Sequence, residues 1–292
     1  MLKAHVNEFI DYCKVVGFSP RSRGSLAITL REFVAFVGGQ PIEAPGEVSY
    51  GLLSSFVADY LEPSVHKKKA RVWCLHQFFH FLTVTGVVRE NPATGLPYPK
   101  IEKTVPFFLT AVEYNRVIEY FSDGADSPVG FRNLVMVLVL GLLGVRTSTL
   151  IALNIEDIDT EAGLALVWEK GDRRRHMVLP ELLTEVLGVY LERLDADSGP
   201  LFPSKRSKRI SQRTMQVIFQ AAASDLGLGR PLHARLFRHT AATLLNQAAG
   251  TTVTQAVLGH ERRANTLRYT HLNPDKYGCY MQRHPYMRRA EA

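Results

Sequence analysis

A tyrosine near the C-terminus lies among residues that are able to hold a phosphate group. Tyr269 stands nine residues after His260, and both Arg238 and Arg146 lie upstream of this pair. A tyrosine phenol is a poor nucleophile at neutral pH, because its unperturbed pKa is about 10. It becomes reactive when cationic donors hold a phosphodiester in place and stabilise the charge that develops on it. These residue types therefore indicate attack of a tyrosine on a phosphodiester.

The segments around these residues resemble the sequence boxes of the phage integrase family, the tyrosine recombinases. The first box of that family usually reads Gly-Leu-Arg-x-Ser-Glu-Leu, and residues 144–150 read Gly-Val-Arg-Thr-Ser-Thr-Leu. Its second box usually reads His-x-Leu-Arg-His-Thr, and residues 235–240 read Arg-Leu-Phe-Arg-His-Thr. Leu-Gly-His at residues 258–260 and Tyr-Thr-His-Leu at residues 269–272 complete the pattern. The resemblance covers essentially the full length of the chain.

The resemblance implies a role for each matching residue. Tyr269 attacks the scissile phosphate and forms a 3′-phosphotyrosyl bond, which keeps the energy of the phosphodiester, so that no ATP or other cofactor is needed. Arg146 and Arg238 grip the non-bridging oxygens and stabilise the transition state. Lys170 protonates the 5′-oxygen that leaves, although neighbouring arginines leave its register ambiguous by a few residues. His260 hydrogen-bonds the phosphate or supports Tyr269.

Two positions depart from the family pattern. Arg235 stands where the family has a histidine, and Thr149 stands where it has an acid. Arg235 keeps a place among the catalytic residues as a donor to phosphate, but an arginine cannot accept the proton of Tyr269. The more positive pocket lowers the pKa of that tyrosine and partly offsets the missing base. His233 offers a substitute proton acceptor only if its segment is a loop, and a capping or surface histidine is the favoured interpretation.

The distribution of charge favours double-stranded DNA as the partner. The formal net charge is +7, and residues 203–240 hold eight lysines or arginines against one acid. Phosphate contacts supply most of the sequence-independent affinity for DNA, although an ordinary solvated loop at residues 205–209 stays open as an alternative. Further cations crowd the start of a helix expected at residues 64–85, where the helix macrodipole disfavours them. The candidate DNA contacts are Lys67, Lys68, Lys69, Arg71, Arg173, Lys205, Arg206, Lys208, Arg209 and Arg213.

Apolar spacing predicts a mostly α protein with a small β-sheet in its C-terminal part. Residues 7–16, 23–37, 50–60 and 64–85 each repeat apolar side chains at the helical period. Thr110 and Glu113 form a capping-box pattern at the start of the second part. A β-hairpin is expected from residues 164 to 179, around Gly171-Asp172. The resemblance implies a two-domain DNA clamp, with a helical core-binding (SAM-like) domain at residues 1–92, a linker at 93–106 and a catalytic domain with a tail at 107–292.

Other features exclude several classes of protein. The three cysteines are far apart in the sequence and form no CxxC pair, which argues against a disulfide framework or a zinc site. The histidines lack metal-ligand spacing, so no metal is expected. The most apolar run, residues 134–145, is too short to span a bilayer and predicts a buried helix. With no signal-peptide pattern at the N-terminus, the expected location is the cytoplasm, at the nucleoid of a prokaryotic-type cell.

These observations together predict a site-specific DNA recombinase. It would act as a homotetramer on DNA, alone or with related recombinases, through a Holliday junction, and its tail would dock either in cis or on a neighbouring protomer. Two alternatives stay open. An accessory DNA-binding protein with lost chemistry is favoured by Thr149 and Arg235, whereas the retained tyrosine, arginines and lysine argue against it. A type IB topoisomerase-like enzyme shares the chemistry but performs no strand exchange.

Overall fold

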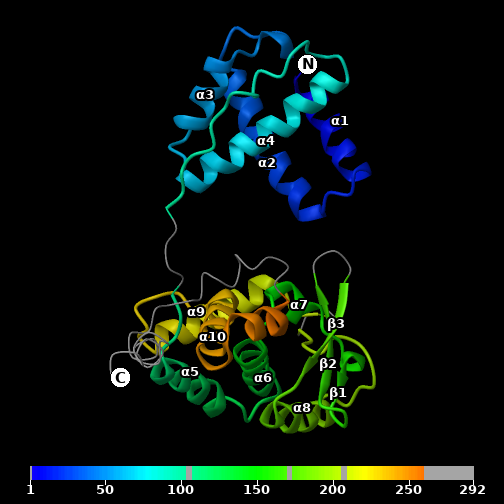
Figure 1. The fold of residues 1–292 in the computed structure, drawn as a ribbon, viewed down its shortest axis with the longest axis vertical. Coiled ribbons are helices and arrows are strands. Elements are labelled where there is room, and N and C mark those ends of the chain that lie inside the picture. The colour runs from blue at the N-terminus through cyan, green and yellow to red at the C-terminus, as the bar shows by residue number, and fades with distance from the viewer. Residues whose placement is uncertain (1, 103–106, 170–172, 205–208, 260–292) are drawn as a thin grey trace, which may run out of the picture. The chain divides into compact units, whose positions relative to one another are not determined.

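The chain divides into two compact units, Met1–Thr104 and Val105–Ala292, which we call the first and the second unit (Figure 1). The computed structural model describes residues 2–102, 107–169, 173–204 and 209–259. Helices dominate both units, and the small sheet belongs to the second unit alone among the described residues. The predicted fold class, mostly α with a small C-terminal sheet, is therefore confirmed.

The first unit is helical, and its helices lie where the apolar spacing predicts them, although α1 and α2 begin earlier than expected. Each of α2, α3 and α4 begins after a serine whose side chain accepts a hydrogen bond from the backbone N–H three residues further on, which satisfies a donor of the first turn. The elements are α1 (Leu2–Val15), α2 (Pro20–Val37), η1 (Pro45–Glu47), α3 (Tyr50–Ala58) and α4 (Val65–Val84).

The apolar faces of these helices meet in one core, in which Phe33 packs edge-on against Phe56 and Phe79. Ala93 and Leu96 also belong to this core and are buried. The Asn91 side chain accepts a hydrogen bond of 2.9 Å from the Ala93 N–H and fixes the chain there. The packing of the first unit thus extends past residue 92, where the sequence predicts that the linker begins.

The second unit is built around α6, which packs against α5, α8 and α10. Its buried side chains include every residue from Val135 to Leu140, so the prediction of a buried helix in this apolar run is confirmed. No helix in the described part of the chain is long and apolar enough to cross a membrane. The helical elements are α5 (Ala111–Asp123), α6 (Pro128–Leu143), α7 (Thr147–Ala152), η2 (Ile155–Asp157), α8 (Glu181–Leu194), α9 (Gln212–Asp225) and α10 (Ala234–Leu258).

The first turn of α5 has the capping box that the sequence predicts. The Thr110 hydroxyl oxygen accepts from the Glu113 N–H at 3.2 Å, and the Glu113 carboxylate accepts from the Thr110 N–H at 2.8 Å. The same carboxylate pairs with Arg230, which lies before α10. Thr240 of α10 adds a second tie, because its hydroxyl oxygen accepts from the Leu109 N–H at 2.9 Å. The entry to the second unit is therefore held against the segment that contains the second arginine box.

The sheet is antiparallel, in the order β1 (Ile158–Asp159), β2 (Leu164–Glu169) and β3 (Arg173–Val178). The β2–β3 hairpin confirms the predicted hairpin, with β3 beginning three residues earlier than expected, whereas β1 was not predicted. Val167 pairs with Arg175 and Trp168 pairs with Arg174. Val167 is fully buried, so Arg175 lies on the side of the hairpin that faces the core. Arg174 lies on the other side, 3.8 Å above the Trp168 ring.

Candidate active site around two arginines

The two arginine boxes meet where α6 ends and α7 begins. Gly144 caps α6 in the left-handed conformation, with φ 59° and ψ 27°, and Arg146 is the N-cap residue of α7. A Cβ atom on residue 144 would lie 2.7 Å from Leu258 Cδ2 and 3.1 Å from the Ala241 Cβ, both in α10. Glycine is therefore required here both by the backbone conformation and by the close approach of α10. This turn presents Arg146, partly buried, at the start of α7.

Arg238 lies on the first part of α10 and is 9% exposed. Its Nη1 donates to the Gly144 carbonyl oxygen at 2.6 Å, and its Nη2 donates to the Leu258 carbonyl oxygen at 3.0 Å. A buried guanidinium that serves two backbone acceptors is fixed in orientation, because its planar donors have set directions. The side chain thereby joins the turn before Arg146 to the last residue of α10, two residues before His260.

A break in α10 makes this geometry available. Twenty residues separate Arg238 from Leu258, and an unbroken helix would place them about 30 Å apart. Gly250 interrupts the helical conformation with φ 79° and ψ 174°, so α10 consists of two helical segments across a kink. The second segment returns toward Arg238 and ends at Leu258, where Gly259 caps it in the left-handed conformation. The kink at Gly250 is thus what brings the Leu258 carbonyl within reach of Arg238.

Thr149, the residue at the family's acid position, is buried on α7 and touches the hairpin. Its hydroxyl donates to the Trp168 carbonyl oxygen at 3.0 Å, one residue before the end of β2. From the other strand, Arg175 Nη2 donates to the Val257 carbonyl oxygen of α10 at 2.8 Å. Sequence reasoning missed both contacts. No local signal marked them, because β2 is apolar up to its last residue and β3 begins with three consecutive arginines.

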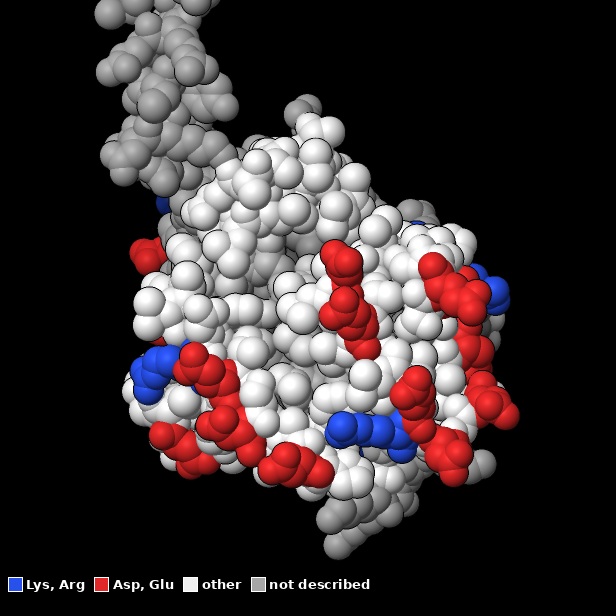
Figure 2. Space-filling view, turned by 90° about the horizontal axis from the view of Figure 1, so that it is seen from below, with Lys and Arg blue, Asp and Glu red and all other residues white. Residues whose placement is uncertain are grey.

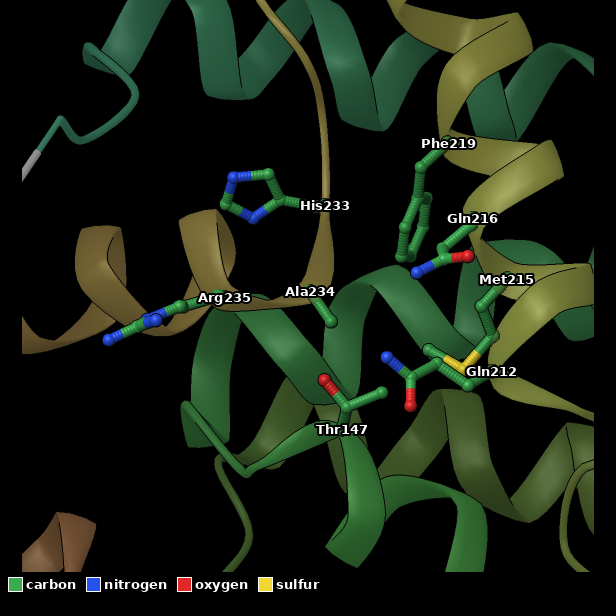
Figure 3. A pocket seen from close by; sticks show the side chains of 8 residues that line it. All are labelled: Thr147, Gln212, Met215, Gln216, Phe219, His233, Ala234 and Arg235. Carbon is green, nitrogen blue, oxygen red and sulfur yellow. The ribbon is translucent and has the colours of Figure 1, made fainter. Parts of the chain in front are cut away.

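Arg235 and His233 lie at the start of α10, beside a cavity of about 310 Å³ (Figure 3). Thr147, at the start of α7, also lines this cavity, together with side chains of α9. Arg235 is exposed, and Figure 3 shows its guanidinium pointing away from Gln212 and Met215 of α9. Its donors are thus presented at the surface, next to the turn that carries Arg146.

His233 is the N-cap residue of α10, in extended backbone conformation, and its Nδ1 accepts a hydrogen bond of 2.9 Å from the Leu236 N–H. Burial lowers the pKa of His233, which favours the neutral ring. In that ring the Nδ1 lone pair is already used, so the proton is on Nε2. The interpretation as a capping histidine is confirmed. The arrangement offers no lone pair with which His233 would replace the missing base.

The prediction that Arg71 contacts DNA is wrong. Its side chain is fully buried in the first unit, where Nη1 donates to the Phe56 and Tyr60 carbonyl oxygens at 2.8 and 2.7 Å. Nη2 donates to the Glu32 carboxylate at 2.9 Å. Lys67 also pairs with Glu32, at 2.9 Å. Lys67 and Arg71, two cations at the start of α4 that were predicted to contact DNA, thus both pair with Glu32.

Arg209 likewise contacts the protein's own backbone. Nη1 donates to the carbonyl oxygens of Ile151 and Leu153 at 2.7 and 2.9 Å, and Nη2 donates to the Asn154 side chain at 2.6 Å. These acceptors lie at the C-terminal end of α7, where carbonyl groups lack helical partners. The Arg209 guanidinium is used to hold α7 in place, which argues against its predicted role as a DNA contact.

The remaining predicted residues fall into two groups. Lys69 and Arg213 are exposed on α4 and α9, Lys68 is partly buried on α4, and Arg173 begins β3. Within the described ranges no group of three His, Cys, Asp or Glu side chains is placed to hold a metal ion. Outside the described residues lie Tyr269, His260, Lys170, Lys205, Arg206 and Lys208.

Comparisons with known proteins show the family of the chain and its fold. Residues 108–276 match the phage integrase family. The chain is 29% identical over 294 residues to the tyrosine recombinase XerC of Bacillus pumilus (strain SAFR-032), covering 96% of each protein. The XerH site-specific recombinase in a post-cleavage complex with a palindromic difH substrate has the same fold, with a TM-score of 0.75 and 21% identity, covering 95% of this chain and 84% of that one.

A second solved structure extends the likeness in fold. A lambda integrase tetramer bound to a Holliday junction gives a TM-score of 0.72 and 17% identity, covering 90% of this chain and 78% of that one. The family match and the likeness to XerC identify an enzyme that breaks and rejoins DNA. The chain belongs to the phage integrase family, the tyrosine recombinases.

Proposed function

We propose that the protein is a site-specific recombinase that cleaves and rejoins double-stranded DNA through a phosphotyrosyl bond at Tyr269. The observation that carries this proposal is the pair of hydrogen bonds from Arg238 to Gly144 and Leu258. They join the turn that presents Arg146 to the end of α10, from which the chain continues to Tyr269. An enzyme that must hold one phosphate between two guanidiniums and a nucleophile needs such a rigid connection.

In the proposed reaction Tyr269 forms a bond to phosphorus as the bond from phosphorus to the 5′-oxygen breaks. Arg146 and Arg238 stabilise the charge on the non-bridging oxygens, and Arg235 adds exposed donors beside them. Lys170 gives a proton to the departing 5′-oxygen. The phenolic proton passes to water, since Arg235 is no acceptor and His233 has its free lone pair engaged as a helix cap. His260 completes the site as a donor to the phosphate or a support for Tyr269.

The charge distribution of the second unit supports one side as the DNA-binding side. Figure 2 views the unit from the side where α5 and α8 lie in Figure 1, and acidic side chains predominate on that face. Phosphates are repelled by such a face. Arg213 and Arg235 are exposed in the first turns of α9 and α10, and Figure 1 draws these two helices above α5 and α8. In this proposal DNA approaches α7, α9 and α10.

The assembly is proposed on the same grounds. The chain has two compact units, and its neighbours in fold include XerH bound to its difH substrate and a lambda integrase tetramer on a Holliday junction. In this proposal the core-binding domain (residues 1–92) and the catalytic domain with its tail (residues 107–292) close around DNA, and four protomers exchange strands through a Holliday junction.

A second candidate function is an accessory DNA-binding protein of the same fold. The engaged lone pair of His233 and the arginine at position 235 favour it, because the described part of the site then holds no evident base for Tyr269. The retention of Arg146 and Arg238 in a fixed arrangement argues for the enzyme, since phosphate binding alone does not require a buried, doubly bonded guanidinium.

A covalent-adduct assay separates the two candidates. Nicked duplexes that tile the DNA flanking the coding region are incubated with wild type, Tyr269→Phe and the matched control Tyr277→Phe, then separated on a denaturing gel. We expect an adduct with wild type and with Tyr277→Phe and none with Tyr269→Phe. Specific binding without any adduct would favour the accessory protein, and Arg235→His with Thr149→Glu would then test whether those positions silence the chemistry.

A further inference from the structure

The end of the β2–β3 hairpin that leads to Lys170 is held by side-chain contacts from outside the sheet. Thr149 of α7 donates to the Trp168 carbonyl on β2, and Arg175 of β3 donates to the Val257 carbonyl on α10. Both contacts adjoin the arginine site. Thr149 lies one helical turn after Arg146, and Val257 directly precedes Leu258, whose carbonyl accepts from Arg238.

We propose that Thr149 and Arg175 are positioning residues for protonation of the leaving 5′-oxygen, because they fix the two strands that flank Lys170 against the arginines. This inference rests on the proposed function and deepens it. Neither residue touches DNA in the proposal. Each acts on the reaction only through the place at which the hairpin holds its lysine.

The pairing of the sheet explains why such anchors are needed. β1 pairs only with Leu164 and Ala165, at the end of β2 that is far from Lys170. Among the described residues the rest of β2 pairs with β3 alone, and a two-stranded ribbon needs packing against other elements to be stable. The anchored residues Trp168 and Arg175 belong to adjacent pairs in this two-stranded part. α7 packs against β2, and the two hydrogen bonds add fixed directions to that packing.

The hydroxyl of Thr149 can form a hydrogen bond that the acid usual at this position in the family cannot. A carboxylate offers only acceptors at neutral pH, so an acid at this position could not donate to the Trp168 carbonyl. The threonine hydroxyl donates to it at 3.0 Å and is buried in doing so. The substitution therefore exchanges a negative charge for a direct bond from α7 to the strand that precedes Lys170.

A sulfur atom in place of the bridging 5′-oxygen tests this role directly. An alcohol leaves with difficulty unless it receives a proton, whereas a thiol ionises with a pKa of about 8.5, as in cysteine, and leaves as a thiolate. Cleavage then breaks the bond from phosphorus to sulfur, and no general acid is required. Misplacement of Lys170 should slow cleavage of the normal duplex and not that of the 5′-phosphorothiolate duplex, whereas loss of Arg146 should slow both.

The experiment measures single-turnover adduct formation on both duplexes at saturating protein, with the scissile position mapped first with wild type. We expect Thr149→Val and Arg175→Met to slow cleavage of the normal duplex by about 10-fold to 100-fold. On the sulfur duplex both should fall within about 3-fold of wild type, as Lys170→Ala should. Thr149→Ser, which keeps the hydroxyl, should restore most of the normal rate.

The neighbouring arginine provides the matched control for charge. Arg174→Met removes the same charge from β3 but leaves the bond from Arg175 to α10 in place. It should therefore change the cleavage rates of the two duplexes by the same factor. Equal slowing of both duplexes by Thr149→Val and Arg175→Met would overturn the positioning role, as would normal rates on both. Restored rates on the sulfur duplex would also show that the variants are folded. Absence of any adduct with wild type would instead reject the proposed function.

Discussion

Arg238 and Gly144 are joined by a hydrogen bond of 2.6 Å, although 94 residues separate them in the sequence. The bond places a buried guanidinium against the turn that presents Arg146, and its second donor reaches Leu258. Arg238 therefore has two tasks in the proposed enzyme. It supports the shape of the site through backbone carbonyls, and it contributes positive charge to the phosphate-binding side.

Arg238→Lys should lower stability as well as cleavage. A lysine retains the charge but cannot span two backbone acceptors with a planar fork, so one buried carbonyl loses its partner. We expect the free energy of unfolding of the second unit to fall by about 2 kcal/mol. Trp168 fluorescence in a Trp73→Phe background measures this unit during urea unfolding, since the chain has only these two tryptophans. The exposed Arg235→Lys is the matched control and should change stability little; equal stability of all three proteins would contradict the prediction.

Arg209 and Arg213 should separate stability from DNA binding. Arg209→Met removes three hydrogen bonds at the end of α7 and should destabilise the second unit by about 2 kcal/mol. Its effect on the salt dependence of DNA binding should be small. Arg213→Met should leave stability unchanged and make the slope of log affinity against log salt shallower by about 0.9, the value of one phosphate contact. Fluorescence anisotropy across a salt series measures the slope, and the reverse assignment of the two effects would refute the prediction.

Local patterns predicted the elements well, because their physical causes are local. The capping box of Thr110 and Glu113 and the buried run in α6 depend on residues within a few turns of each other. The cap formed by His233 is equally local, since Leu236 is three residues away. The N-terminal bound of α2 was missed although its signal was present, because Pro20 follows Ser19 as a first helical residue follows its cap.

Long arginine side chains were harder to place, because their partners are distant in sequence. Arg71 bonds to Glu32, 39 residues away, and Arg209 bonds to Ile151, 58 residues away. The number of cations in a segment does not show which carboxylate or backbone carbonyl each of them will bind. Helical spacing did hold a warning for Arg71, which shares a face of α4 with the buried Leu75 and Phe78. The kink at Gly250 also had a local signal, because a glycine inside a helical pattern favours a break, but the sequence does not show where the second segment then points.

The helix cap formed by His233 should make the second unit less stable in mild acid. The folded protein lowers the pKa of this ring, so the unfolded chain binds the proton first as the pH falls. Stability is full above the unfolded pKa of about 6.5, declines below it, and levels off once the pH passes the folded value. Unfolding of the Trp73→Phe protein from about pH 7.5 to about pH 5 should show this decline.

His233→Asn isolates the effect, because asparagine caps helices without titrating. Every other histidine titrates alike in both proteins, so the difference between their stability curves belongs to residue 233. The difference should grow in favour of the asparagine variant as the pH falls through this window. His233→Ala should cost about 1 kcal/mol at neutral pH, where the native cap is intact. Parallel curves for the histidine and asparagine proteins would show that the cap does not titrate.

Glu32 should prove important for the first unit because it is the counter-charge of a fully buried arginine. The Arg71 side chain has 0% exposure, and that of Glu32 has 23%. Glu32→Gln leaves the guanidinium without a negative partner, which should destabilise the unit by about 2–3 kcal/mol, below the full cost for a wholly buried pair. Trp73 fluorescence in a Trp168→Phe background reports this loss. Glu8→Gln, which breaks an exposed contact with His5, is the control and should cost under about 0.5 kcal/mol.

The Glu32 carboxylate also predicts how the stability of the first unit changes with pH. Burial alone would raise the pKa of Glu32, but the hydrogen bonds and charges of Lys67 and Arg71 outweigh it and hold that pKa below its ordinary value. Its contribution is therefore full above the unfolded pKa and is lost as the pH falls through the lower, folded value. The Glu32→Gln protein should lack this part of the acid-induced loss. The double variant Glu32→Gln with Arg71→Met should recover much of the lost stability, because the uncompensated charge is gone. A double variant less stable than Glu32→Gln would contradict this. It would show that the hydrogen bonds from Arg71 to Phe56 and Tyr60 outweigh the cost of desolvating Arg71.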